Sequence, residues 1–315
     1  MTSAPVRTSV IVPTRNRPER LQRCLAALIA QRCDPREYEV IVVDDGSDAP
    51  LDDIAGAVSA PVNIMLIRQP HAGPAAARNN GASRATGELL AFTDDDCEPD
   101  PQWIAALSAR HRQFPQAMIG GRTVNALTLN TCAEASQLLV DYLYEYYAGE
   151  DRTAANGPAR TAGVRFFTSN NLAVPSALFQ AVGGFDPGFR LAAGEDRELC
   201  DRWHTHGYPL VFEPDALVRH SHALSVARFW RQHLNYGRGA RQVRLARQRR
   251  QAQTVGIEPL RFYRELVLYP FRVRPAGQAV GLSALLTLSQ VANAIGYLRE
   301  RTATADIVSA SEPRP

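Results

Sequence analysis

The chain has 315 residues, of which 45% are hydrophobic and 21% are charged, and its formal net charge is +3. These values are typical of a globular protein with one large or two modest domains, and they exclude a disordered chain. Its five cysteines show no CxxC spacing, which argues against a zinc site and for free thiols. Residues 1–7 lack the apolar segment of a signal peptide. We therefore expect a cytoplasmic protein.

Short apolar segments alternate with helical patterns in the first part of the chain. Strands are expected at residues 8–12, 40–43, 62–67 and 89–93, with a small-residue helix at 75–84. The helix after the first strand has apolar residues with helical spacing, namely Leu21, Cys24, Leu25, Leu28 and Ile29. This alternation predicts an α/β fold with a doubly wound, mostly parallel sheet and helices on both faces.

Three consecutive aspartates, Asp94, Asp95 and Asp96, follow the fourth expected strand. Adjacent carboxylates repel one another, so the cluster is unfavourable unless a cation or a hydrogen-bonding ligand neutralises it. Ligands of open α/β sheets bind beyond the strand ends, and hard oxygen ligands suit Mg²⁺ or Mn²⁺, which in turn bind diphosphates. The simpler alternative is an acidic start to the helix expected from Gln102.

The pattern is less regular after about residue 120. A tyrosine-rich stretch at 141–147 precedes a polar loop expected at 150–163, and order resumes at 166–174. A helix from residue 195 to about 206 and a last strand, Leu210–His220, follow. We therefore divide residues 1–224 into halves of about 1–120 and 121–224.

Residues 225–315 form a basic extension that is expected to be helical. Residues 225–274 alone carry twelve arginines and two glutamates, which leaves the rest of the chain acidic. Amphipathic segments with arginines can lie on an anionic membrane surface, and residues 225–298 are the expected contact on the inner face of the membrane. A homo-oligomer interface or an acceptor-covering element is the alternative, and no nucleic-acid recognition fold accompanies the charge.

Six short motifs stand in the order found in family-2 glycosyltransferases, which the chain resembles over residues 9–222. They are residues 12–17, 43–47, 73–81, 93–96, 183–186 and 194–196. The resemblance implies a GT-A fold and transfer of a sugar from a nucleotide diphosphate sugar, with a UDP-sugar favoured. The acceptor hydroxyl would belong to a glycan or a lipid, and the residues beyond 222 lie outside the resemblance.

The resemblance also implies which residues bind the donor. They are Pro13, Thr14, Arg15, Asp44, Arg78, Asp94 and Asp95. Asp44 is expected to accept hydrogen bonds from uracil or ribose, and Asp45 to shape a turn, although either aspartate could cap that turn. Arg78 is expected to bind a base carbonyl or a phosphate, the alternative being a surface arginine.

The implied metal ligands are Asp96 and a histidine after the last strand. Mn²⁺ or Mg²⁺ is the expected ion, and imidazole suits Mn²⁺ better. His220 and His222 share one side of a strand, and we favour His220. The alternative is one structural and one exposed histidine.

Asp196 is the expected general base. Inverting transfer needs a carboxylate within hydrogen-bond reach of the acceptor hydroxyl, on the face opposite the leaving diphosphate. Asp196 follows Glu195 at an expected helix start, in the family's glutamate–aspartate motif. The alternative is a helix-end charge that complements the helix dipole, an effect below about 1 kcal/mol.

Two other classes of protein fit parts of this pattern. Sugar nucleotidyltransferases share the sheet, but they carry a lysine in a glycine-rich segment after the first strand, and this chain has no lysine. A non-catalytic sugar-binding protein would not need the whole set of aspartates, which are Asp44, Asp94, Asp96 and Asp196. Both remain alternatives to the transferase.

Overall fold

The structure is a computed structural model that describes residues 7–51, 61–150, 165–251 and 258–311. It contains an eight-stranded sheet in the order β3-β2-β1-β4-β7-β6-β8-β5. The strands are β1 (Thr8–Thr14), β2 (Tyr38–Asp44), β3 (Asn63–Arg68), β4 (Leu89–Phe92), β5 (Cys97–Pro99), β6 (Met118–Asn125), β7 (Leu172–Pro175) and β8 (Leu210–His220).

The first four strands are all parallel, as the alternation of strands and helices predicts. The other half of the sheet is mixed, because β7 runs antiparallel to both β4 and β6 while β6 and β8 are parallel. Short β5 closes the sheet antiparallel to β8. The expected α/β class with a mostly parallel sheet is confirmed, since β5 and β7 alone among these eight strands run against the common direction.

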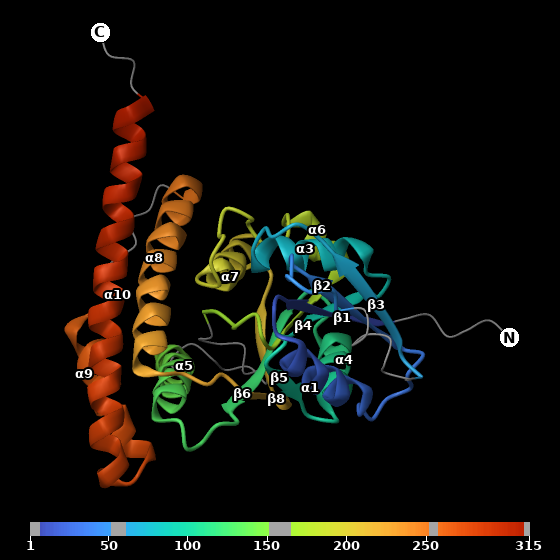
Figure 1. Cartoon of the computed structure of the whole chain (residues 1–315), viewed down its shortest axis with the longest axis horizontal. Helices are drawn as coiled ribbons and strands as arrows, with labels where there is room; N and C mark the ends of the chain where they lie inside the picture. The colour runs from blue at the N-terminus through green and yellow to red at the C-terminus, as the bar shows by residue number, and fades with distance from the viewer. Residues whose placement is uncertain (1–6, 52–60, 151–164, 252–257, 312–315) are drawn as a thin grey trace, which may run out of the picture.

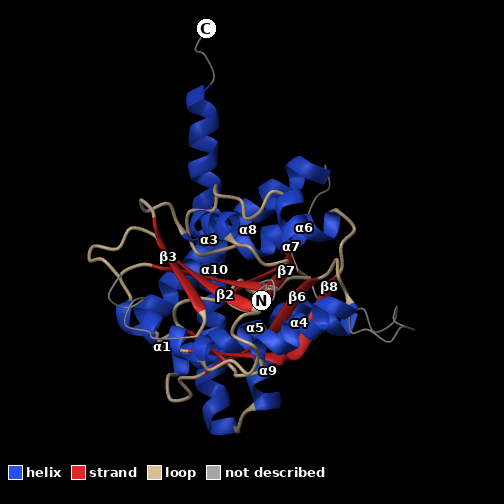
Figure 2. Ribbon diagram, turned by 90° about the vertical axis from the view of Figure 1, so that its right-hand side faces the viewer, coloured by secondary structure: helices blue, strands red, loops and turns tan. Residues whose placement is uncertain are grey.

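Helices cover both sides of the strands (Figure 2). They are α1 (Pro18–Ile29), α3 (Pro74–Arg84), α4 (Trp103–Gln113), α5 (Thr131–Glu150), α6 (Ser176–Ala181), α7 (Glu195–Thr205), α8 (Val226–Gln251), α9 (Leu260–Val273) and α10 (Ala276–Ser311). Each face of the sheet has its own core. In β1, Val10 and Val12 belong to one core and Ile11 to the other, because successive side chains of a strand point to opposite faces.

One long helix was not predicted from the sequence. The tyrosine-rich stretch at 141–147 lies inside the 20-residue helix α5, in a part of the chain for which the pattern indicated no particular element. The Tyr142 ring contacts the rings of Phe262 and Tyr269, and its hydroxyl donates a hydrogen bond to the Phe262 carbonyl oxygen. This helix therefore depends on distant partners in α9. Residues 151–163 of the expected loop lie outside the described residues.

The C-terminal extension is helical, as expected, and α8, α9 and α10 stand side by side next to α5 and α7 (Figure 1). Phe229, Leu266 and Leu286 are fully buried and join the same core as α5 and α7. The extension thus shares its core with the rest of the protein.

Much of the arginine excess of the extension is neutralised inside the protein. Arg250 forms ion pairs with Glu198 and Asp201 of α7, and Arg247 also pairs with Asp201. Four further arginines of the extension pair with glutamates, namely Arg238, Arg261, Arg272 and Arg274. Four of these arginines, namely Arg247, Arg250, Arg272 and Arg274, pair with residues of α5 and α7 and so join the extension to the rest of the protein.

Candidate active site

The register of the sheet brings the aspartate cluster to the end of β8. Strand β4 is buried throughout, and the chain turns sharply after it, with the Cys97 N–H bonded to the Asp94 carbonyl oxygen at 3.1 Å. Cys97 of β5 then pairs with His220, and the Ser221 N–H donates to the Asp96 carbonyl oxygen at 2.8 Å. Residues more than a hundred positions apart thus meet at one edge of the sheet.

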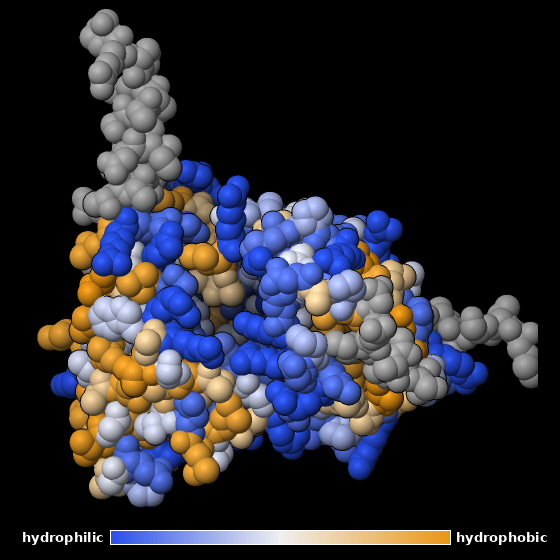
Figure 3. Space-filling model, viewed as in Figure 1, coloured by the Kyte–Doolittle hydropathy of each residue, from blue (hydrophilic) through white to orange (hydrophobic). Residues whose placement is uncertain are grey.

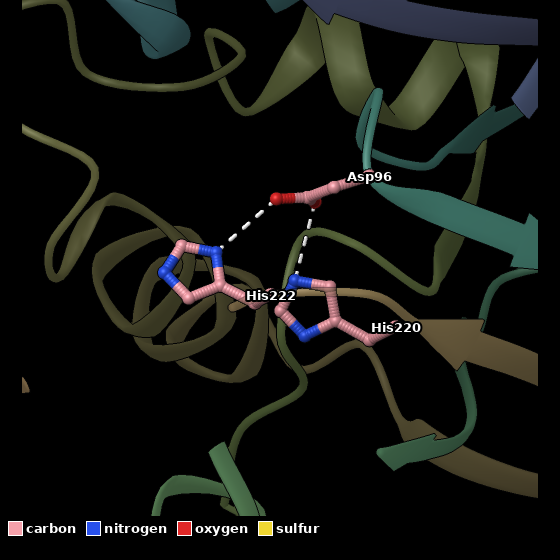
Figure 4. A group of neighbouring side chains, drawn as sticks. All are labelled: Asp96, His220 and His222. Carbon is pink, nitrogen blue, oxygen red and sulfur yellow. Dashed lines mark hydrogen bonds and ion pairs between the residues drawn. The ribbon is translucent and has the colours of Figure 1, made fainter. Parts of the chain in front are cut away.

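Asp96 contacts both candidate histidines (Figure 4). Its two carboxylate oxygens lie 3.2 Å from His220 Nε2 and 3.2 Å from His222 Nδ1. Burial by itself would raise the pKa of Asp96, but hydrogen bonds and charge from the two histidines hold this pKa well below its usual value. One ligand atom from each of the three residues lies within 4.8 Å of the others. Both histidines, rather than His220 alone, are therefore placed to act with Asp96.

Two arginines that the sequence analysis did not single out complete the surroundings of the cluster. Arg20 donates to an Asp96 oxygen at 2.9 Å, and Arg17 donates to Asp95 at 3.0 Å. Asp95 is buried, which raises its pKa to about 6 despite the opposing charge of Arg17. Their spacing in the sequence could have identified them, because Arg17 and Arg20 are three residues apart at a helix start and therefore lie on one face of the helix. Two guanidinium groups at a carboxylate cluster also suit an anionic ligand.

Arg78 is buried and joins the aspartate cluster to the start of α7. Its guanidinium donates to Asp94 at 2.7 Å and to Glu195 at 3.1 Å, and it lies over the ring of Phe185 at 5.5 Å from the centroid. The small residues of α3 allow this helix to pack closely against the sheet, since a Cβ at Gly81 would lie 2.6 Å from the Ile11 side chain. Arg78 is therefore carried into the interior. Arg78 is thus no surface arginine, and its two carboxylate partners hold it at the centre of the site.

The Arg78→Ala substitution is expected to destabilise the fold strongly. It leaves Glu195 buried without its counter-charge, and breaking a buried ion pair from one side costs about 3–5 kcal/mol. Urea unfolding measures the change. The matched control is Arg219→Ala, which removes a surface pair with Asp100 and should cost less than about 1 kcal/mol. Equal, small losses in both variants would contradict the structural role of Arg78.

Glu195 and Asp196 open α7 in different environments. Gly194 precedes them in a left-handed conformation with a φ of 93°, and Glu195 is buried against Arg78. Asp196 is half-buried, and its Oδ1 accepts the Arg197 N–H at 2.7 Å. Burial raises the pKa of both carboxyl groups, and for Glu195 the neighbouring Asp196 charge adds to the effect. A raised pKa makes a carboxylate a better proton acceptor near neutral pH.

The remaining predicted donor residues lie at the ends of β1 and β2. Asp44 is buried and accepts the Ser47 N–H at 2.8 Å, so it caps the turn that was expected to use Asp45. Asp45 instead accepts the N–H groups of the loop that leads into α3, at 2.8 and 2.9 Å. A nucleotide contact of Asp44 stays a prediction, because a carboxylate has further acceptor capacity.

The first motif is divided between the site and its rim. Thr14 is buried, and its hydroxyl donates to Asp95 at 2.8 Å. Pro13 is half-buried in β1, whereas Arg15 is exposed and its Nε donates to the Gly46 carbonyl oxygen at 3.3 Å. The motif thus reaches the carboxylate cluster through Thr14 and through its last residue, Arg17.

A parallel half-sheet joined to a mixed half, with acidic residues at the strand ends, is the architecture of GT-A glycosyltransferases. The chain has this fold in common with the mannosyltransferase PcManGT from Pyrobaculum calidifontis in complex with GDP-Man and Mn²⁺, with a TM-score of 0.60 and 18% identity over 99% of this chain and 84% of that one. S. aureus TarS 1–349 in complex with UDP-GlcNAc is also similar, with a TM-score of 0.53 and 15% identity over 96% and 92% of the two chains.

The sequence matches Glycosyl transferase family 2 over residues 9–170, and the chain belongs to this family. A second match, to Glycosyl transferase family group 2, covers residues 138–298. It includes most of the extension, which the motif resemblance had left outside.

Two curated relatives are glycosyltransferases of known name. The Pre-mycofactocin glycosyltransferase of Mycobacterium tuberculosis is 33% identical over 217 residues, which are 68% of this chain and 42% of that protein. The Validoxylamine A glucosyltransferase of Streptomyces hygroscopicus is 32% identical over 226 residues, which are 64% of this chain and 49% of that protein. The chain thus spans less than half the length of these two relatives.

Proposed function

We propose that the protein transfers a sugar from a nucleotide diphosphate sugar to an acceptor hydroxyl, with inversion and with a divalent cation. The observation that carries the proposal is the arrangement around Arg78, which places the Asp94–Asp96 cluster on one side and the start of α7 on the other. Diphosphate binding and proton removal can therefore occur side by side in one site. Family membership and the named glycosyltransferase relatives support the sugar transfer itself.

The donor atoms around Asp96 fit a divalent cation of the Mn²⁺ type. One carboxylate oxygen and two imidazole nitrogens lie within 4.8 Å of one another, and imidazole favours Mn²⁺ over Mg²⁺. Asp96, His220 and His222 would hold the ion, which would offset the charge that develops on the departing diphosphate. Mn²⁺ accompanies GDP-Man in PcManGT, which supports this choice.

The residues of this chain have separate tasks in the proposed reaction. Arg17 and Arg20 are placed to bind phosphate oxygens, since their guanidinium groups already lie at the cluster. Asp44 would contact the nucleotide at the end of β2. Asp196 would take the proton from the acceptor hydroxyl, because Glu195 is engaged by Arg78.

A panel of UDP- and GDP-sugars with Mn²⁺ tests the function. We expect UDP-sugars to bind and to release UDP slowly to water, and NMR of the freshly released sugar to show an inverted anomeric centre. Formation of pyrophosphate from a nucleoside triphosphate and a sugar phosphate would assign the protein to the nucleotidyltransferases. Binding without turnover in the presence of glycan and lipid acceptors would favour a sugar-binding protein.

We further propose that α9 and α10, rather than the arginines of α8, make a peripheral membrane contact that brings the enzyme to a lipid-linked or cell-envelope acceptor. Hydrophobic surface gathers over these helices (Figure 3). Among the described residues, seven of the twelve large exposed hydrophobic side chains lie on them, namely Leu260, Leu268, Phe271, Val273, Val280, Val291 and Leu298. The segment Ala276–Glu300 is long and apolar enough to cross a membrane, although 39% of its most apolar window is buried in the protein.

The membrane contact predicts that the wild type sediments with vesicles of phosphatidylglycerol and phosphatidylcholine. A Leu268→Ser, Phe271→Ser double variant should bind at least about tenfold more weakly, since full burial of each side chain is worth roughly 1.5–3 kcal/mol. Both side chains are about half exposed, so the fold should tolerate the change. Leu129→Ser, at a residue that is 98% exposed outside the extension, is the control. No sedimentation of the wild type, together with a concentration-dependent dimer, would assign this face to a protein interface.

A further inference from the structure

Helix α8 of the extension touches the backbone that leads into Asp196. Gly194, the residue that caps α7, lies so close to Gly239 of α8 that a Cβ at Gly194 would be 3.1 Å from the Gly239 backbone. In the opposite direction, a Cβ at Gly239 would lie only 2.2 Å from the Ala193 carbonyl oxygen. The two backbones meet with no room for a side chain between them.

A second contact joins the same two helices farther along α7. Arg250 of α8 pairs with Asp201 at 2.7 Å and also with Glu198, and Arg247 pairs with Asp201. Glu198 and Asp201 are about half a turn and about one and a half turns after Asp196 on α7. Helix α8 therefore fixes both the start and the middle of the helix that carries the proposed base.

Helix α10 supports α8 from its other side. A Cβ at Gly237 would lie 1.9 Å from the Asn293 carbonyl oxygen, and a Cβ at Gly296 would lie 1.9 Å from the Leu234 carbonyl oxygen. Gly237 and Gly239 thus give α8 two close backbone contacts, one directed to α10 and one to the start of α7.

We propose that α8 positions Asp196 for proton transfer and that Gly239 is the positioning residue. This inference rests on the proposed function, because it takes Asp196 as the base. Residues near 239 lie far from the aspartate motifs in sequence, yet their contact with Ala193 and Gly194 determines the position of the first residues of α7. The extension then contributes to catalysis by holding Asp196 in place on the acceptor side of the site.

The test is Gly239→Ala, assayed with Mn²⁺ by the release of UDP from a UDP-sugar to water, which serves as the acceptor. Contacts of a real Cβ are essentially never shorter than 3.0 Å, so the Ala193–Gly194 backbone must move by about 1 Å. A misplacement of about 1 Å lowers a rate on the order of 10²-fold. We expect kcat to fall by about this factor, while the donor KM and the affinity for UDP stay within a few-fold of wild type.

Three other glycines of the extension are matched controls. Cβ atoms at Gly277 and Gly281 would meet nothing within 4 Å, so both alanine variants should behave as wild type. Gly237→Ala creates a still closer contact, at 1.9 Å, but directs it at α10. It should therefore lower the melting temperature while reducing kcat much less than Gly239→Ala does.

Several outcomes would overturn the proposal. One is a folded Gly239→Ala enzyme with nearly normal kcat, and another is a Gly237→Ala enzyme that loses as much kcat as Gly239→Ala. If Gly239→Ala does not fold, Gly194→Asn disturbs the same contact from the side of α7, because asparagine tolerates a left-handed backbone. A Cβ there would lie 3.1 Å from Gly239, so a smaller loss of kcat is expected, again with unchanged affinity for UDP. Asp196→Asn in the same assay tests the proposed base separately from its positioning by Gly239. An active Asp196→Asn enzyme would refute the choice of Asp196 as the base.

Discussion

Asp196→Asn is expected to reduce the rate of sugar transfer by about 10²–10⁴-fold, the usual effect of removing a general base. Asparagine keeps the Oδ1 atom that accepts the Arg197 N–H, so the start of α7 should stay intact. The affinity for UDP should barely change, because Asp196 belongs to the acceptor side. Steady-state transfer kinetics and calorimetry of UDP binding measure the two effects separately.

The control for this experiment is Glu19→Gln. Glu19 lies exposed in the first turn of α1, where its charge interacts with the helix dipole. This is the only role that Asp196 would have if it were a helix-end charge and not the base. That interaction is worth under about 1 kcal/mol, so the control should cost little. If a folded Asp196→Asn enzyme also transfers sugar within a few-fold of wild type, the base lies elsewhere. Glu195 is then the first residue to examine.

Asp96→Ala is expected to abolish the enhancement of UDP binding by Mn²⁺. Loss of a residue that merely orients a metal ligand lowers metal affinity by about 10–100-fold, and loss of a ligand should lower it at least as much. Binding of UDP without metal should persist, because the substitution releases Arg17 and Arg20 from Asp96. Calorimetry with and without Mn²⁺, on wild type and variant, gives the four affinities that decide the question.

Asp100→Ala is the matched control for Asp96→Ala. Asp100 lies four residues farther along the chain, and it pairs with Arg219 at the surface. Its removal should leave both UDP affinities within a few-fold of wild type. Four equal affinities in the Asp96 experiment would refute a metal site at Asp96 and would leave Arg17 and Arg20 as the phosphate-binding groups.

The sequence by itself determined strands β1 to β4 and β8 and the strand ends at which the site lies, whereas β5 and β6 were not predicted. Strands buried on both faces read as continuous apolar runs, as β4 does, and β8 has the predicted ends, Leu210–His220. The aspartates follow β4 directly, so their location at a strand end needed no knowledge of the fold. Local pattern sufficed in each case, because a buried strand and the turn after it are defined by neighbouring residues.

Only the tertiary structure decided which side chains meet. The pairing of β5 with β8 brings both His220 and His222 to Asp96, and the depth of α3 joins Arg78 to Glu195. Helix α5 and the contact of Gly239 with Ala193 likewise depend on segments far away in sequence. Such contacts are set by strand register and by close backbone packing, and neither leaves a periodic signal in the residues themselves.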